Sequence, residues 1–174
     1  RQARGYKANQ VRIFRIRKWE NDKQLPTRAE KLWYPPLERT VLQRASDKGD
    51  QVFYASAGMP TTLVEGRVTE GDFFIVSEWE NTDLMVLSEI GFIDSKDISN
   101  NIENLYHELF TWKGEDMYIY SSKVGNHLMG GSELAGIIYP SIISGNKSEN
   151  IALKKQGFQV RSEEHTSELQ SRLK

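Results

Sequence analysis

The sequence contains no cysteine among its 174 residues. It therefore lacks disulfide bonds, thiolate metal ligands and a cysteine nucleophile. A chain of this composition fits a reducing compartment, and we expect a cytoplasmic location. The apolar runs are far shorter than the roughly 20 residues of a membrane-spanning helix, so we expect no contact with membranes. The formal net charge of −1 gives no overall field for nucleic acid, and we expect no direct nucleic-acid binding.

Several familiar motifs are also missing. The chain has no G-x-G-x-x-G, no G-x-x-x-x-G-K-[ST] and no G-x-S-x-G, which removes the signatures of Rossmann, P-loop and hydrolase-elbow sites. His107 and Glu108 lack the second histidine of a zinc-binding helix, so we expect no metal. The sequon at Asn146 has no signal peptide to support it, and we interpret it as a chance match.

Both ends of the chain look artificial. It opens on Arg1 rather than methionine, so we expect an upstream piece to be missing and interpret residues 1–10 as an N-terminal extension. Residues 161–174 resemble the translated read-through of a sequencing-library adapter, and we expect them to be a non-native tail. One domain over residues 11–160 remains, in agreement with the length of the chain.

The order of elements along the chain predicts the fold class. Alternating patterns and β-branched residues predict strands at 11–17, 51–55, 72–79, 84–87, 136–141 and 149–154. The third and fourth of these could form a hairpin over 81–83. Helical spacing predicts a helix start at 60–64, a helix with its apolar face over 98–110 that ends at Gly114, and another helix over 117–129. Helices between groups of strands, without regular βαβ alternation, favour a single α+β domain.

The stretch from residue 43 to residue 65 delivers three chemically distinct side chains. Arg44 precedes Tyr54 by ten residues, and Glu65 follows it by eleven. A cation for phosphate, a ring for stacking and a carboxylate for ribose hydroxyls or an oxocarbenium ion suit a nucleotide sugar. The spacing alone does not establish such a site.

An ordered set of short motifs supports that interpretation. The chain resembles the RES-domain family, named for its Arg, Glu and Ser, through Phe-Arg-Ile-Arg at 14–17, Leu-Trp-Tyr-Pro-Pro at 32–36, Arg-Ala-Ser at 44–46, Val-Phe-Tyr-Ala at 52–55, Thr-Leu-Val-Glu at 62–65, Gly-Ile-Ile-Tyr-Pro-Ser at 136–141 and Glu-Asn-Ile-Ala-Leu-Lys at 149–154. The chain departs from the family pattern at Gln43, where glycine is frequent, at Ser46, and at residues 142–144. These departures concern the phosphate side of the expected site.

The resemblance implies a fold and an activity. The fold is an ADP-ribosyltransferase-like split β-sheet core with flanking helices. The activity is degradation of NAD⁺ as substrate, with inorganic phosphate or water as acceptor. Characterised members are toxins of toxin–antitoxin pairs, which implies a Xre-type antitoxin as a possible partner. Two alternatives stay open: transfer of ADP-ribose to a macromolecule, and a non-catalytic module that binds a nucleotide or a partner.

The resemblance also implies roles for individual residues. Glu65 would stabilise positive charge on the ribose, Tyr54 would stack on the nicotinamide or ribose, and Ser141 would donate a hydrogen bond to phosphate or to the amide. Arg44 and Arg15 would clamp the pyrophosphate, with Arg17 as the alternative early arginine.

Each assignment has a structural alternative. Arg44 could be a surface residue beside a turn, Tyr54 could belong to the core, Glu65 could favour the start of its helix by charge, and Ser141 could satisfy backbone groups. Trp33 and Tyr34 could pack beneath the site or stack within it.

Overall fold

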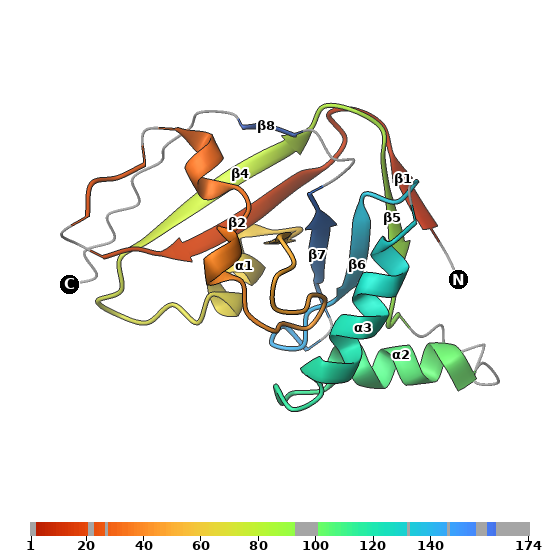
Figure 1. The fold of residues 1–174 in the computed structure, drawn as a ribbon. Helices are drawn as coiled ribbons and strands as arrows, with labels where there is room; N and C mark the ends of the chain where they lie inside the picture. The colour runs from red at the N-terminus through yellow and green to blue at the C-terminus, as the bar shows by residue number, and fades with distance from the viewer. Residues whose placement is uncertain are drawn as a thin grey trace.

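The computed structural model describes residues 3–20, 23–26, 28–92, 101–131, 133–145, 147–155 and 160–162. These residues form one mixed sheet in the order β1-β5-β6-β7-β3-β2-β4-β8. The strands are β1 Ala3–Tyr6, β2 Arg12–Lys18, β3 Val52–Ser56, β4 Phe74–Asn81, β5 Met85–Glu89, β6 Gly136–Pro140, β7 Glu149–Lys154 and β8 Val160–Ser162. The helices are α1 Met59–Glu65, α2 Asn101–Thr111 and α3 Tyr118–Met129, with short 3-10 helices at Ala29–Leu32 and Leu37–Arg39. The expected single α+β domain is confirmed (Figure 1).

The sheet is nearly divided into two halves. Strands β2 and β3 are aligned only at Phe14 and Ser56, whereas β2 and β4 pair along seven residues each and β3 and β7 along five. In Figure 1 the long strands β2 and β4 diverge from the group formed by β3, β7, β6, β5 and β1. This near-separation matters because it opens the space in which the candidate site lies.

The hairpin considered between the third and fourth predicted strands is wrong. Strand β4 pairs with β2 and β8, and β5 pairs with β1 and β6. The side chain of Asn81 explains why the chain does not turn back on itself. It accepts a hydrogen bond from the Val11 amide and donates to the carbonyl oxygens of Lys7 and Asp83. These bonds tie the β1–β2 and β4–β5 connections together as both cross between the half-sheets.

The two faces of the central strands carry different cores. On β3 and β7, Phe53, Ile151 and Leu153 pack in one cluster with Trp79, Met85 and Leu87 of neighbouring strands. The alternate residues, Val52 and Ala152 among them, pack with Phe110 of α2 and Leu128 of α3. Because successive side chains of a strand point to opposite faces, Tyr54, Ser56 and Asn150 belong to the second face, the one covered by α2 and α3.

The segment at residues 32–36 packs beneath the first face. Trp33 stacks on Tyr34 with ring centroids 5.7 Å apart and meets the edge of Trp79 at 5.2 Å. The Tyr34 hydroxyl donates to the Lys154 carbonyl at 2.9 Å. Of the two interpretations of these aromatic residues, the structure therefore favours packing, because neither lines the cleft described below.

Helix α1 is short and sits close to β2. It begins after Gly58, with Pro60 in its first turn, as the sequence predicts. Gly66 ends it and has no room for a side chain, since a Cβ there would lie 2.6 Å from Cγ2 of Ile16. The expectation that Glu65 sits near the helix start is wrong: it is the last residue of α1. A carboxylate is disfavoured at that end by the helix dipole, so other groups must hold it.

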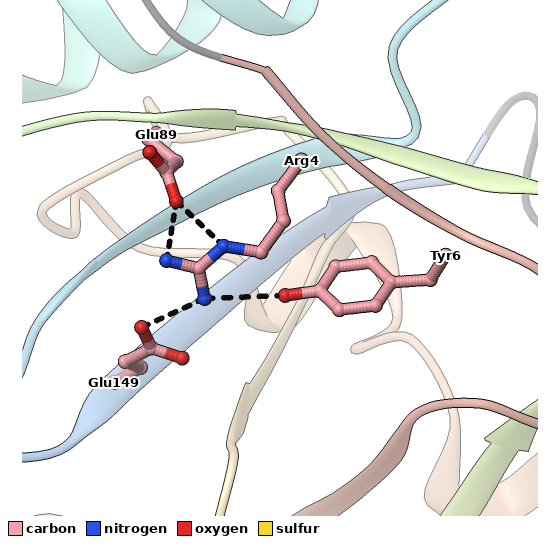
Figure 2. A network of polar contacts seen from close by, with 4 residues as sticks. All are labelled: Arg4, Tyr6, Glu89 and Glu149. Atoms are coloured by element: carbon pink, nitrogen blue, oxygen red, sulfur yellow. Dashed lines mark hydrogen bonds and ion pairs between the residues drawn. The ribbon is translucent and has the colours of Figure 1, made fainter.

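The ends of the described chain join the sheet. Residues 3–6 of the expected N-terminal extension form β1 and pair with β5. Arg4 links this edge strand to Glu89 and Glu149 and donates to the Tyr6 hydroxyl (Figure 2). Strand β8 pairs with β4 across the expected domain boundary at residue 160. Most of the expected tail, residues 163–174, lies outside the described residues, as do residues 98–100 of the predicted helix.

Candidate functional site

A cleft of about 820 Å³ opens where the two half-sheets diverge. Its walls come from residues 14–16 of β2, residues 39–44, strand β3, the end of α1, the connection between α2 and α3, and residues 139, 140, 142 and 143. This volume lies within the roughly 300–1,000 Å³ typical of small-molecule and cofactor sites. Arg15, Arg44, Tyr54 and Glu65 all line the cleft, so segments far apart in the sequence bring four of the five predicted residues together.

Glu65 is held at the cleft wall by two neutral donors. The Ser141 hydroxyl donates to its Oε1 at 2.6 Å, and Asn150 Nδ2 donates to the same oxygen at 2.7 Å. These bonds offset the unfavourable position at the C-terminal end of α1. Within the described part of the chain, neither of these donors reaches Oε2. The carboxylate is thus fixed through one oxygen beside an open cleft.

Ser141 differs from its expected role. Its side chain is fully buried and does not line the cleft. Its hydroxyl hydrogen is committed to Glu65, and its Oγ accepts the Ser144 amide at 3.4 Å. The expected hydrogen bond from Ser141 to phosphate or to an amide is not available in this arrangement. The residue instead orients the carboxylate, because it follows β6 directly and lies behind Glu65.

Arg15 brings a half-buried positive charge to the cleft. Its Nη1 donates to the Tyr54 carbonyl at 2.9 Å, and its guanidinium carbon lies 4.7 Å from the centre of the Phe53 ring. Its Nε is buried and has no hydrogen-bond partner among the described residues. Burial, and secondarily the charge of Arg17, lowers the pKa of Arg15 to about 9, so the side chain is still a cation at pH 7. A buried donor without a partner fits an anionic ligand.

The structure distinguishes Arg15 from Arg17. Arg17 donates to the carbonyl oxygens of Lys31 and Trp33 at 2.8 and 2.5 Å, and it does not line the cleft. Burial, followed by the charge of Arg39, lowers the pKa of Arg17. Arg17 therefore anchors the segment below the sheet, and Arg15 is the early arginine placed at the site.

Arg44 faces the cleft from the opposite wall. Its guanidinium donates to the carbonyls of Leu109 and Trp112 at 3.1 and 2.8 Å, where α2 ends. Its central carbon lies 5.0 Å from the centre of the Tyr118 ring. A cation at a helix C-terminus is favourable, so Arg44 has a structural role. It is also held in a fixed position beside the cleft.

Tyr54 shapes the loop that carries Arg44. Its hydroxyl oxygen accepts the Ala45 amide at 3.1 Å and forms a hydrogen bond with Ser46 at 2.9 Å. Burial of the phenol raises the pKa of Tyr54 well above its usual value. The ring borders the cleft, while the hydroxyl faces the protein. Tyr54 is thus part core and part cleft wall.

The loop at residues 44–50 packs closely against α3. A side chain at Gly125 would place its Cβ 2.8 Å from Cα of Ala45, so glycine permits this close approach. The Ser122 hydroxyl donates to Asp47 at 2.8 Å, and Asn126 donates to Asp50 at 2.6 Å. These contacts keep the segment that follows Arg44 rigid.

The cleft contains further polar and charged residues that the sequence motifs did not identify. Asn150 lies within a quoted motif, yet its role depends on contacts made across strands. A polar residue on the same strand face as the buried Ala152 is the signal that could have identified it. Additional charges line the mouth of the cleft, namely Arg39, Arg67, Lys113 and Glu115.

The described residues contain no group of three or more histidine, aspartate or glutamate side chains suited to a metal ion. His107 bonds through Nδ1 to the Gly91 carbonyl at 2.6 Å, and His127 lies exposed in the last turn of α3. Within the same part of the chain, no helix combines the length and apolar character needed to cross a bilayer.

Comparison with known proteins supports the resemblance. The model of the RES domain family matches residues 12–171, which is nearly the whole chain. A search of curated proteins found no match. The family match includes every element that lines the cleft. The chain therefore belongs to the RES domain family.

Proposed function

We propose that this protein degrades NAD⁺ by breaking the bond between nicotinamide and ribose, with phosphate or water as the acceptor. The observation that carries the proposal is the arrangement of Glu65. Its carboxylate is tied through Oε1 to Ser141 and Asn150 at the wall of a cleft that is also lined by the half-buried cation Arg15. Membership of the RES domain family agrees with an NAD-related activity.

The carboxylate suits the charge that the reaction develops. As nicotinamide departs with the electrons of the glycosidic bond, positive charge builds on the ribose ring. A fixed negative group beside that ring stabilises the transition state more than the ground state. Glu65 would provide this charge and accept hydrogen bonds from ribose hydroxyls. An acceptor oxygen then forms the new bond to the same ribose carbon.

The cationic side of the cleft suits the pyrophosphate. The lining residues include five cations, Arg15, Arg39, Arg44, Arg67 and Lys113, and three anions, Asp50, Glu65 and Glu115. Arg15 has an unpartnered Nε, and a phosphate oxygen would satisfy it. Guanidinium groups bind oxyanions with directed hydrogen bonds. Arg15 and Arg44 would hold the diphosphate, with the Tyr54 ring beside the nicotinamide or ribose.

The acceptor and the partner are proposed by analogy with the family. With phosphate as acceptor the products are nicotinamide and ADP-ribose 1″-phosphate, and with water they are nicotinamide and ADP-ribose. We also propose that a Xre-type antitoxin protein restrains the activity, which makes the protein a toxin of a cytoplasmic toxin–antitoxin pair.

The test is to incubate the purified protein with NAD⁺ in phosphate and in a phosphate-free buffer, and to identify the products by chromatography and mass spectrometry. Phosphate-dependent release of nicotinamide with ADP-ribose 1″-phosphate would establish phosphorolysis. Release that is independent of phosphate would establish hydrolysis. A label from adenine-labelled NAD⁺ that is found on a macromolecule would indicate ADP-ribosyl transfer. Binding of NAD⁺ by the folded protein without any release would contradict the proposal and favour a non-catalytic module.

A further inference from the structure

Asn150 stands between a buried serine and the carboxylate of the site. It is 8% exposed and pairs with Ser56 of β3 on one side and with Tyr139 of β6 on the other. Its Nδ2 donates to Glu65 Oε1 at 2.7 Å, and its Oδ1 accepts the Ser56 hydroxyl at 2.9 Å. The side-chain amide of Asn150 in β7 therefore links β3 to α1.

The chemistry of the partners fixes the orientation of this amide. An ionised carboxylate only accepts hydrogen bonds, so the NH₂ group must face Glu65. The carbonyl oxygen of Asn150 then faces Ser56, whose hydroxyl can donate. A flipped amide would lose the bond to Glu65, although the Ser56 hydroxyl could then accept from the NH₂ group. Glu65 thus determines which way Asn150 points, and Ser56 supports that orientation by donating to Oδ1.

Two donors on Oε1 leave the other carboxylate oxygen for a ligand. Ser141 approaches Oε1 at 2.6 Å and Asn150 at 2.7 Å, while the cleft lies against the Glu65 side chain. Ser141 comes from the end of β6 and Asn150 from β7, so the two bonds restrain the carboxylate from two directions. Rotation of the Glu65 side chain would break both.

We propose that Asn150 is a positioning residue that, supported by a hydrogen bond from Ser56, holds Glu65 with Oε1 tied and Oε2 directed to the ribose of the substrate. This inference rests on the proposed function of Glu65. Asn150 does not itself contact the reacting atoms; it acts through the carboxylate. Its neutrality is essential, because the group that touches Glu65 must donate a hydrogen bond without adding charge.

Asn150 donates a neutral hydrogen bond to Glu65, and the charged groups of the site lie on the surrounding elements. The charged and titratable groups on the surrounding elements are Arg15 of β2, Tyr54 of β3, Arg44, Arg67 after α1, Tyr139 of β6, and Lys113 and Glu115 between α2 and α3. Glu149 precedes Asn150, but its carboxylate lies on the other face of the sheet, where Arg4 binds it (Figure 2). An aspartate at position 150 would therefore place a new carboxylate against Glu65.

The experiment compares Asn150→Ala, Asn150→Asp and Ser56→Ala with wild type in nicotinamide release. We expect Asn150→Ala to lower kcat by about 10²-fold, as misplacement of a catalytic group does, with KM changed less than about threefold. Ser56→Ala should lower kcat by about fivefold, the effect of one neutral hydrogen bond. The matched control for the serine variant is Ser121→Ala, which removes a buried hydroxyl that does not line the cleft, and its kcat should remain that of wild type.

Asn150→Asp separates positioning from a structural role. Two carboxylates in contact share a proton, and the introduced side chain, once protonated, can donate to Glu65. The ratio of the activity of this variant to that of wild type should therefore rise as the pH falls from 8 to 5. A ratio independent of pH, or a loss confined to KM in Asn150→Ala, would overturn the proposal.

A measurement that does not depend on catalysis separates this inference from the proposed function. The ¹³C-labelled side-chain carboxyl of Glu65 is assigned by its absence in Glu65→Gln, and its chemical shift is compared between wild type and Asn150→Ala. If wild type releases no nicotinamide, the proposed function fails while a shifted resonance still supports the contact to Asn150. An unchanged resonance would show that Asn150 does not hold Glu65.

Discussion

Arg4 and Arg15 show two ways in which this fold treats a half-buried arginine. Arg4 lies on one face of the sheet and meets two carboxylates, Glu89 and Glu149 (Figure 2). Arg15 lies at the division of the sheet and has one hydrogen bond to a backbone carbonyl. Burial alone would lower the pKa of Arg4, but Glu149 and Tyr6 outweigh it and raise that pKa. The pKa of Arg15 is instead lowered to about 9 by burial.

The difference separates a structural arginine from one kept for a ligand. Ion pairs with Glu89 and Glu149 balance the charge of Arg4 within the protein, whereas no acidic side chain is paired with Arg15 among the described residues. An unbalanced buried cation destabilises the free protein. Such an arrangement is typical of functional sites, and a phosphate in the cleft would supply the missing negative charge.

The largest effect is expected from Arg15→Met. Loss of charged hydrogen bonds to phosphate should weaken NAD⁺ binding by about 10- to 100-fold. Binding is measured by calorimetry in a Glu65→Gln background, so that turnover does not intervene. At the same time, the free energy of unfolding of the ligand-free protein should rise by about 1 kcal/mol, because an unsatisfied buried donor is removed. A variant that loses stability and keeps its affinity would make Arg15 a structural residue.

An opposite effect on stability, without an effect on activity, is expected from Arg4→Met. This change leaves Glu89 and Glu149 without their cation, so the free energy of unfolding should fall. Since Arg4 is 37% exposed, solvent screening reduces the cost to about 1–2 kcal/mol. Denaturant unfolding gives this value. Nicotinamide release per folded molecule should be unchanged, and a selective loss of activity would contradict the contrast between the two arginines.

The smallest effect concerns an exposed ion pair. Lys18, followed by the backbone and hydroxyl of Thr69, lowers the pKa of Asp72 from 3.8 to about 2. Because this pKa is lower in the folded state, the carboxylate stabilises the protein above pH 3.8, and the contribution disappears as the pH falls through 2. The difference in stability between wild type and Asp72→Asn should therefore shrink between about pH 4 and pH 2. Acid titration followed by circular dichroism measures it, and a constant difference would contradict the assignment.

The sequence predicted most elements because their patterns are local. Strand β7 has the predicted bounds, and β2, β3 and β6 differ by one residue at an end or at both ends. Helix α3 begins one residue later than predicted. Alternation or helical spacing marks the buried side of these elements, and glycine or proline marks an end of β6 and of α3. The single domain of mixed α+β type follows from the order of these elements.

Strand pairing and the hydrogen bonds that hold Glu65 could not be predicted from local patterns. The pairing of β4 with β2 depends on the Asn81 side chain, which bonds to backbone groups about 70 residues earlier in the chain. Motifs identified Glu65 and Ser141, yet their direct hydrogen bond and the contribution of Asn150 arise only when β6, β7 and α1 meet. The choice between Arg15 and Arg17 likewise depended on the position of the cleft, which Arg15 lines and Arg17 does not.

The most direct test of the central claim compares wild type with Glu65→Gln in binding and in single-turnover release of nicotinamide from NAD⁺. Glutamine keeps the size of the side chain and removes its charge. We predict that binding stays within about threefold while release falls by at least about 10²-fold, because the carboxylate acts on the transition state. Near-normal release by folded Glu65→Gln would contradict the account.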